Sequence, residues 1–301
     1  MGTGGVGGYF GAKLARAGAA VTFVARGAHL NAIRAHWLRI KSSVEGGFVV
    51  TAPATDDLGQ VGPVDLVLFC VKSFDTETAA RALGAAVGAD TAILSLQNGV
   101  DNEEKIDAIL GPGHALGGAA YVFAAIESPG LIVHSLGGRI VFGELDGRES
   151  RRARRTREMF ERAGIPVELS REIQRVLWEK YLFIVAQSGL TALTRCPIGI
   201  IRSVPETRKM YQMILEEVAA LAKAAGVGLA PTAVDSIMTA ADKLPPTNYS
   251  SLHYDLTHGK RLELEALQGH AVRLGERLGV SAPMCFAVYA ALKPYLNGPP
   301  A

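Results

Sequence analysis

The sequence has few cysteines, no long hydrophobic run and no signal-peptide pattern. Its 301 residues contain only three cysteines, Cys70, Cys196 and Cys285, and they form no CxxC pair. This pattern argues against a disulfide scaffold and a cysteine-ligated zinc site, and it is typical of a reducing compartment. No apolar stretch reaches the ~20 residues of a membrane span, and the N-terminus lacks the charged and apolar regions of a signal peptide. We therefore expect a cytoplasmic protein without a membrane partner.

The chain also has no large excess of positive or negative charge, since the formal net charge is only +2. This value is too small to predict a nucleic-acid partner. The basic run at residues 148–155 has no aromatic side chains between its arginines, so we interpret it as the solvated face of a helix. The seven histidines are scattered without metal-ligand spacing, so no metal site is expected. No G-x-S-x-G context surrounds Ser188 or Ser251, which removes the main support for a hydrolase.

What is present is an alternation of helix and strand patterns in the first half of the chain. Continuous apolar runs at residues 66–71 and 92–96 are typical of strands buried on both faces. Such alternation predicts parallel strands joined by crossover helices. Helices are predicted at residues 4–18, 29–35, 76–87 and 102–110. Further strands are predicted at residues 20–25, 115–123, 131–135, 139–143 and 165–169, with a hairpin turn at Gly137 and Gly138.

The remainder of the chain has a different character. Residues 172–296 show almost only helical periodicity, and prolines interrupt it. These interruptions are at Pro197, Pro205, Pro231, Pro245, Pro246 and Pro283. We predict an α/β domain at residues 1–168 and an all-α domain at residues 169–301.

The chain opens with a glycine-rich segment that satisfies the pattern G-x-G-x-x-G at Gly2, Gly4 and Gly7. Gly2 permits a tight turn, Gly4 lets a pyrophosphate approach the backbone, and Gly7 lets the next helix pack closely. The unpaired N–H groups at the start of that helix then face the phosphates. The segment predicts a Rossmann-type dinucleotide-binding domain. Its predicted cofactor-binding residues are Gly2, Thr3, Gly4, Gly5, Val6 and Gly7.

Residues at the ends of the predicted strands refine the cofactor. Arg26 follows the strand at 20–25, and no acidic residue stands where one would bind the ribose hydroxyls of NAD. Because an arginine there can pair with a 2′-phosphate, NADPH is the predicted cofactor. Lys72 and Asn98 follow the strands at 66–71 and 92–96. The carboxyl ends of parallel strands are where an open α/β sheet binds its ligand, so both are predicted cofactor-binding residues.

One expected element is missing from the sequence. The glycine fingerprint should follow a strand, but only Met1 precedes Gly2. Because that first strand is central in the fold, we expect an upstream apolar segment that a misassigned start codon would omit. Without it, the sheet must leave a gap or recruit another segment, and nucleotide affinity should suffer.

In the helical half, Lys180 lies within the segment LWEKYLF, on an otherwise apolar helix. Most lysines on amphipathic helices are simply solvated. Here the flanking apolar residues indicate a half-buried ammonium at a cleft, where its charge polarises a carbonyl.

Five motifs now stand in order along the chain: GTGGVGGYFGAKLARAG, CVK ending at Lys72, QNG around Asn98, LWEK ending at Lys180, and SSL-H-Y-D-x-x-x-G-K followed by Glu263. In order and spacing they resemble the motifs of the ketopantoate reductase family, over essentially the whole chain. The resemblance implies an NADP-dependent oxidoreductase with a helical domain similar to that of 6-phosphogluconate dehydrogenase and a cleft between its domains. The implied reaction reduces a 2-oxo acid, first of all 2-dehydropantoate (ketopantoate) to pantoate, as in pantothenate biosynthesis.

The resemblance also implies roles by position. Lys180 would donate the proton to the ketone oxygen and bind the substrate, and Asn98 would hydrogen-bond cofactor and substrate. Asn248 and Ser251 would contact the substrate. Glu263 would act with Lys180 in the catalytic network at the cofactor and substrate hydroxyls.

Ser251 and Glu263 would lie about 18 Å apart on one unbroken helix, at 1.5 Å per residue. We therefore expect the helix to break between them if both reach one site, and Gly259 is the predicted place.

The chain departs from the family at three positions that carry asparagine in members acting on ketopantoate. Here these positions hold Ile184, Ser188 and Ile198. Each lost hydrogen bond costs about 1 to 3 kcal/mol when the substrate's polar group stays buried. We expect a more apolar pocket, in which Ser188 is kept as a substrate-contact candidate.

Two alternatives remain open beside a ketopantoate reductase. One is a related β-hydroxy acid dehydrogenase with a more apolar substrate, and the other is an inactive or NADPH-sensing binding protein. The oligomeric state is also open, with a homodimer as one outcome.

Overall fold

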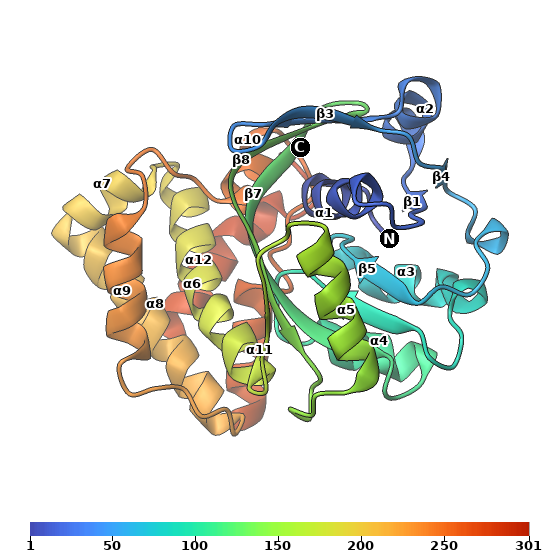
Figure 1. Cartoon of the computed structure of the whole chain (residues 1–301). Helices are drawn as coiled ribbons and strands as arrows, with labels where there is room; N and C mark the ends of the chain where they lie inside the picture. Colours follow the sequence, from blue (N-terminus) through green and yellow to red (C-terminus); the bar gives the residue numbers. More distant parts are fainter. Residues whose placement is uncertain (301) are drawn as a thin grey trace. The chain divides into compact units, whose positions relative to one another are not determined.

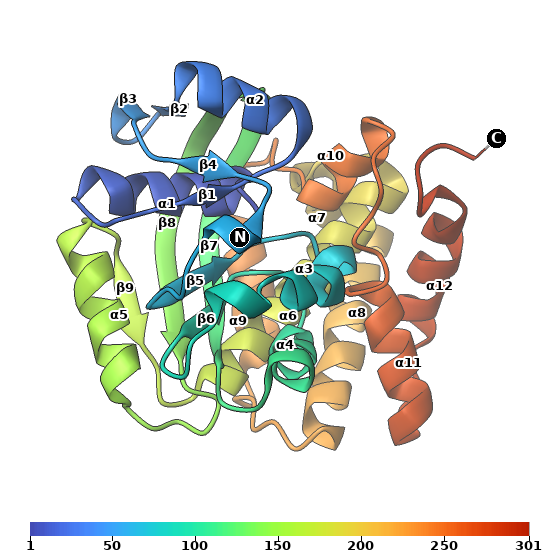
Figure 2. The same cartoon turned by 90° about the vertical axis from the view of Figure 1, so that its right-hand side faces the viewer.

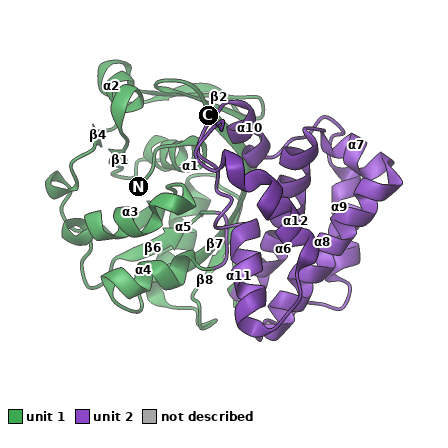
Figure 3. Ribbon diagram, turned by 180° about the vertical axis from the view of Figure 1, so that it is seen from behind, with its two compact units in different colours: residues 1–97, 101–173 green, residues 98–100, 174–301 purple. Residues whose placement is uncertain are grey.

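The computed structural model describes residues 1–300, which form two compact units (Figure 3). Unit 1 comprises Met1–Gln97 and Asp101–Ile173, and unit 2 comprises Asn98–Val100 and the chain from Gln174 onward. The units divide after Ile173, whereas the sequence pattern predicts a boundary at residue 168.

Unit 1 is built on a mostly parallel sheet (Figure 1). Strands β5 (Leu66–Phe69), β6 (Ala92–Ser95) and β7 (Ala115–Ser128) are parallel neighbours. Antiparallel to β7 runs β8 (Leu131–Gly143), which pairs on its other side with β2 (Leu38–Ser42) and β9 (Val167–Leu169). At the edge, β3 (Gly46–Val50) pairs with β2. The predicted α/β class with parallel strands is confirmed.

Helices cover both faces of this sheet (Figure 2). Helices α1 (Gly5–Arg16) and α5 (Arg151–Arg162) share a hydrophobic core with Ala92 and Leu94. Helices α3 (Thr76–Ala82) and α4 (Asn102–Leu110) share another core with Ile93. Alternate residues of β6 therefore point to opposite, equally covered faces, which explains why this strand reads as a continuous apolar run.

The predicted hairpin turn at Gly137 and Gly138 is wrong. Strand β8 is continuous from Leu131 to Gly143, and the turn lies instead between Ser128 and Leu131, at Pro129 and Gly130. Tyr121 pairs with Arg139 and Val122 pairs with Gly137, so Gly138 is the extra residue of a β-bulge. Both glycines have positive φ, +82° and +119°. Positive φ serves a bulge as well as a turn, so glycine alone does not distinguish the two.

The basic run is only partly a solvated helix face. Arg154 and Arg155 on α5 are exposed, as predicted. Arg152, however, is 22% exposed and forms an ion pair with Glu144 at 2.7 Å. It also donates to the carbonyl of Gly113 at 2.5 Å, and so it ties the start of α5 to the loop before β7.

The first residues of the chain connect two strands that do not pair with each other. Strand β1 (Phe23–Val24) pairs with β4 (Ala54–Thr55) in a separate two-stranded sheet. The Met1 carbonyl accepts from the Cys70 N–H at 2.9 Å, after the end of β5. Gly2 and Thr3 donate to the Val24 carbonyl of β1, at 3.2 and 2.9 Å. The backbone of residues 1–3 thus lies between β1 and β5 and is hydrogen-bonded to both segments.

Unit 2 is helical. Helix α6 (Ile173–Thr194) contributes Tyr181, Leu182, Val185 and Leu190 to its core. The other helices are α7 (Ile198–Ser203), α8 (Pro205–Ala224), α9 (Ala233–Lys243), α10 (Ser251–Thr257), α11 (Gln268–Leu278) and α12 (Pro283–Leu292).

The prolines interrupt these helices as predicted. Pro197 is the N-cap of α7, and Pro205 and Pro283 open α8 and α12, where the missing N–H costs nothing. No helix within residues 1–300 combines the length and apolar character required to cross a membrane.

Candidate functional site

The glycine-rich turn lies at the N-terminus of α1 in unit 1. Gly2 has φ +86°, and a Cβ on Gly7 would lie 2.3 Å from the Gly2 carbonyl oxygen, so α1 can approach the turn only with glycine there. At Gly4, the N-cap of α1, a Cβ would meet no atom within 4 Å. The backbone at Gly4 therefore borders open space beside the helix N-terminus. These features fit a bound pyrophosphate.

Arg26 forms the N-cap of α2 (Gly27–His36), two residues after the end of β1, and its side chain is exposed. The first turn of α2 contains no acidic side chain. A Cβ on Gly27 would meet no atom within 4 Å. A helix N-terminus favours anions, and arginine binds phosphate through two parallel N–H bonds. Arg26 and the N-terminus of α2 therefore fit a bound phosphate ester.

The ends of β5 and β6 are tied together by a glutamine. Gln97, 6% exposed, donates its amide to the Val71 carbonyl at 2.9 Å and to the Thr76 hydroxyl at 2.8 Å. Lys72 is half-buried and caps the short 3-10 helix η2 (Ser73–Asp75). Asn98, also half-buried, is the first residue of the segment Asn98–Val100 that belongs to unit 2.

In unit 2, Lys180 is half-buried on α6, as its apolar flanks predict. Trp178 and Tyr181 beside it are 5% and 1% exposed, and their rings meet edge to face at 5.6 Å. The Tyr181 hydroxyl donates to the Leu267 carbonyl at 2.6 Å, which fastens α6 to the start of α11. The helix that carries Lys180 is therefore rigidly held.

The predicted substrate contacts occupy different environments. Asn248 accepts a hydrogen bond from the Gln187 amide at 3.2 Å. Ser251 is the exposed first residue of α10, whose N-cap, Ser250, pairs with the Thr191 hydroxyl at 2.7 Å. The Thr191 and Ser250 pair thus fixes the start of α10 on α6.

Ser188 lies inside the core of unit 2. It is 0% exposed, and its hydroxyl accepts from the Gln268 amide at 3.0 Å. Gln268 was not predicted as a site residue, although a glutamine at the start of a helix with a strong apolar face is a signal for a buried polar contact. In this environment Ser188 supports the packing of α6 on α11.

Glu263 is 6% exposed and lies between α10 and α11. Helix α10 ends at Thr257, and Gly259 has φ +62°. The predicted helix break at Gly259 is confirmed. Glu263 therefore has its own orientation, independent of the helix that begins at Ser251.

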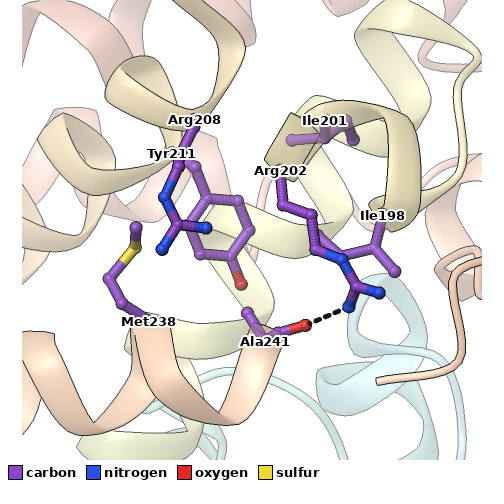
Figure 4. A pocket seen from close by; sticks show the side chains of 7 residues that line it. All are labelled: Ile198, Ile201, Arg202, Arg208, Tyr211, Met238 and Ala241. Atoms are coloured by element: carbon purple, nitrogen blue, oxygen red, sulfur yellow. Dashed lines mark hydrogen bonds between the residues drawn. The ribbon is translucent and has the colours of Figure 1, made fainter. Parts of the chain in front are cut away.

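A pocket in unit 2 is lined by Ile198, one of the three positions where the family carries asparagine, but by none of the predicted catalytic, cofactor-binding or substrate-binding residues (Figure 4). Its two arginines are already engaged: Arg202 donates to the Ala241 carbonyl at 3.0 Å, and Arg208 pairs with Asp242 at 2.6 Å. Its lining residues are Ile198, Ile201, Arg202, Arg208, Tyr211, Met238 and Ala241. Among residues 1–300, no group of three histidine, cysteine or acidic side chains could hold a metal ion.

Comparison with known proteins gives a consistent answer over both units. The family model described as ketopantoate reductase PanE/ApbA matches residues 1–147, and its C-terminal counterpart matches residues 172–296. An uncharacterized oxidoreductase, YkpB, from Bacillus subtilis (strain 168) is 30% identical over 98% of this chain and 97% of its own length. The 2-dehydropantoate 2-reductase of Halobacterium salinarum is also 30% identical, over 94% of this chain and 93% of that protein.

A solved structure is similar as well. The PanE/ApbA family ketopantoate reductase from Ralstonia eutropha JMP134 has a TM-score of 0.91 and 34% identity, covering 98% of this chain and 96% of that one.

Proposed function

We propose that this chain, which belongs to the ketopantoate reductase family, reduces a 2-oxo acid to the 2-hydroxy acid with NADPH, and that ketopantoate is the first substrate to test. Membership of the family supports oxidoreductase activity, and we propose NADPH as the cofactor and a 2-oxo acid as the substrate. The observation that carries the proposal is the open backbone at Gly4, at the N-terminus of α1. A dinucleotide pyrophosphate needs this combination of space and unpaired N–H groups.

In unit 1, each candidate group has one task. The N–H groups of Gly5, Val6 and Gly7 bind the pyrophosphate, and Lys72 adds a positive charge at the end of β5. Arg26 binds the 2′-phosphate, which is the part of NADPH that NADH lacks. NADPH, when bound, supplies the hydride that reduces C2 of the oxo acid.

The residues outside the glycine-rich turn would carry the proton chemistry. Lys180 would stabilise negative charge on the substrate's ketone oxygen and donate a proton to it, the task of a general acid. Asn98 would orient cofactor and substrate, and Glu263 would complete the hydrogen-bonded network. Asn248 and Ser251 would hold the rest of the substrate.

A more apolar 2-oxo acid is the second candidate substrate. It is favoured by the half-buried hydrocarbon of Ile184, one helical turn after Lys180, and by the enclosed hydroxyl of Ser188. The Ile184 side chain has no hydrogen-bonding group, and the Ser188 hydroxyl is already bonded to Gln268.

The test has two steps. Isothermal titration measures the affinity for NADPH, and a single-turnover experiment then follows the loss of NADPH absorbance after ketopantoate is added. Binding followed by absorbance loss supports a reductase. Binding without absorbance loss on any of a panel of 2-oxo acids supports an NADPH-sensing protein, and absence of NADPH binding contradicts the proposal.

A further inference from the structure

His29 joins two parts of unit 1 that are distant in the sequence. It lies in the first turn of α2, three residues after Arg26. The Gly130 N–H, in the turn between β7 and β8, donates to its Nδ1 at 3.0 Å. One turn further along α2, the Ala32 Cβ lies 3.1 Å from where a Cβ on Gly130 would be. Helix α2 is therefore seated directly on this turn.

The backbone of Thr3, in the glycine-rich turn, also influences the pKa of the His29 ring. Because Nδ1 accepts a hydrogen bond, the neutral ring carries its proton on Nε2. Nε2 is buried and has no hydrogen-bond partner within residues 1–300. Burial lowers the pKa of His29, and the Thr3 backbone opposes this only in part. The ring is thus neutral near pH 7, and Nε2 is closed off from solvent.

The glycine-rich turn and Arg26 are each fixed to a neighbouring element. The Thr3 N–H and hydroxyl each donate to the Val24 carbonyl at 2.9 Å, which anchors the glycine-rich turn on β1. The Arg26 carbonyl accepts from the Leu30 N–H at 3.3 Å, so the Arg26 backbone moves with the first turn of α2. Any tilt of α2 at His29 would therefore displace Arg26 relative to the glycine-rich turn.

We infer that His29 is a positioning residue for cofactor selection: its ring holds the first turn of α2, and with it Arg26, on the turn between β7 and β8. The inference rests on the proposed use of NADPH. His29 acts without touching the cofactor, because its Nε2 is buried and its Nδ1 accepts from the Gly130 N–H. It orients Arg26, which contacts the 2′-phosphate. In this way His29 affects the preference for NADPH over NADH.

The experiment measures dissociation constants for both NADPH and NADH at one ionic strength, using the full chain. His29→Leu removes both ring nitrogens. It should raise the dissociation constant for NADPH about tenfold, the scale of one charge-assisted hydrogen bond, and that for NADH by less than about threefold. A purely structural role would weaken the two cofactors equally.

Two variants serve as controls for the ring. His29→Asn keeps an acceptor oxygen at the position of Nδ1, within reach of the Gly130 N–H, and should retain most of the NADPH preference. His36→Leu changes an exposed histidine on the same helix and should alter neither affinity. Far-UV circular dichroism and thermal unfolding verify that each variant is folded.

A double-mutant cycle tests the route of the effect. In an Arg26→Ala background, His29→Leu should no longer change the ratio of the two dissociation constants, because the residue through which it acts is gone. Equal losses for both cofactors, or a ratio change that persists without Arg26, overturn the role of His29 alone. A wild-type chain that binds neither dinucleotide, or prefers NADH, overturns the proposed function and this role with it.

Discussion

Gln268 and Ser188 join α11 to α6 through a hydrogen bond of 3.0 Å in the core of unit 2. The same amide donates to the Val185 carbonyl at 2.8 Å. Gly189 makes this approach feasible, because a Cβ there would lie 2.9 Å from the Gln268 amide nitrogen. The hydroxyl of Ser188, at a position where family members that act on ketopantoate carry asparagine, thus takes part in the packing of α6 against α11.

The first prediction concerns the substrate's side chain. Ketopantoate and 3,3-dimethyl-2-oxobutanoate differ only by a hydroxyl group. We expect their kcat/KM values to agree within about threefold, because Ile184 offers that hydroxyl no partner and Ser188 is enclosed; a paired hydroxyl would be worth about 1 to 3 kcal/mol. Steady-state kinetics with both acids measures the ratio.

Variants at one position sharpen this comparison. Ile184→Asn restores an amide and should shift the ratio toward ketopantoate by about tenfold, whereas Ile184→Leu, the size-matched control, should leave it unchanged. A wild-type preference for ketopantoate of thirtyfold or more, on the order of a full buried hydrogen bond, would contradict the predicted apolar site.

The second prediction concerns Lys180. Lys180→Ala should lower turnover by at least about a hundredfold, the scale of general acid catalysis, while NADPH binding is largely retained. Single-turnover absorbance and isothermal titration separate the two effects. Lys243→Ala, at an exposed lysine that ends α9, is the control and should change neither. An unaltered rate in Lys180→Ala would refute its role.

The third prediction separates two glycines of the fingerprint. Gly4→Ala places a Cβ in open space, so the free protein should unfold at nearly the wild-type temperature while NADPH affinity falls. Gly7→Ala instead forces a Cβ within 2.3 Å of the Gly2 carbonyl and should cost about 1 to 3 kcal/mol of stability. Thermal unfolding and titration of each variant measure both quantities. Undiminished NADPH affinity in Gly4→Ala would argue against pyrophosphate binding at this turn.

The fourth prediction concerns acid stability. Glu45 accepts from Lys13 at 2.5 Å and from Tyr9 at 2.9 Å, and Lys13 is only 4% exposed. Burial raises the pKa of Glu45, but the hydrogen bonds from Lys13 and Tyr9 outweigh it and hold the pKa below its usual 4.5. A carboxyl with a lowered pKa stabilises the fold above about pH 4.5 and loses this contribution as the pH falls through its folded-state pKa.

Glu45→Gln should therefore reduce the free energy of unfolding at pH 7 by about 1 to 3 kcal/mol. The difference from wild type should shrink below pH 4.5, where the wild-type carboxyl also becomes protonated. Urea denaturation at a series of pH values measures it. Glu168→Gln, which breaks an exposed pair with Arg139, should have little effect at any pH. A difference that is constant with pH would rule out the charge of Glu45 as the cause.

Much of the architecture could be predicted from local patterns. The apolar runs of β5 and β6 and the full extent of α4, Asn102–Leu110, were recognisable because their burial and periodicity are properties of neighbouring residues. The family assignment, made from five short motifs, is confirmed by matches over both units. Strands β2, β3 and β4 were not predicted: β3 lies at the sheet edge and β4 has only two residues, so both carry weak patterns, whereas β2 lies between β3 and β8 and its alternation of buried and exposed residues was missed.

The sequence by itself determined the class of each half, the glycine turn and the positions of the helix breaks, because these depend on backbone preferences of residues close in the chain. Only the tertiary structure decided that Gly138 is a bulge, that Ser188 is enclosed by Gln268 and that His29 meets Gly130. The last two contacts join residues 80 and 101 positions apart. Such pairs form when helices and sheet pack, and no local pattern encodes which distant partner a polar side chain will find.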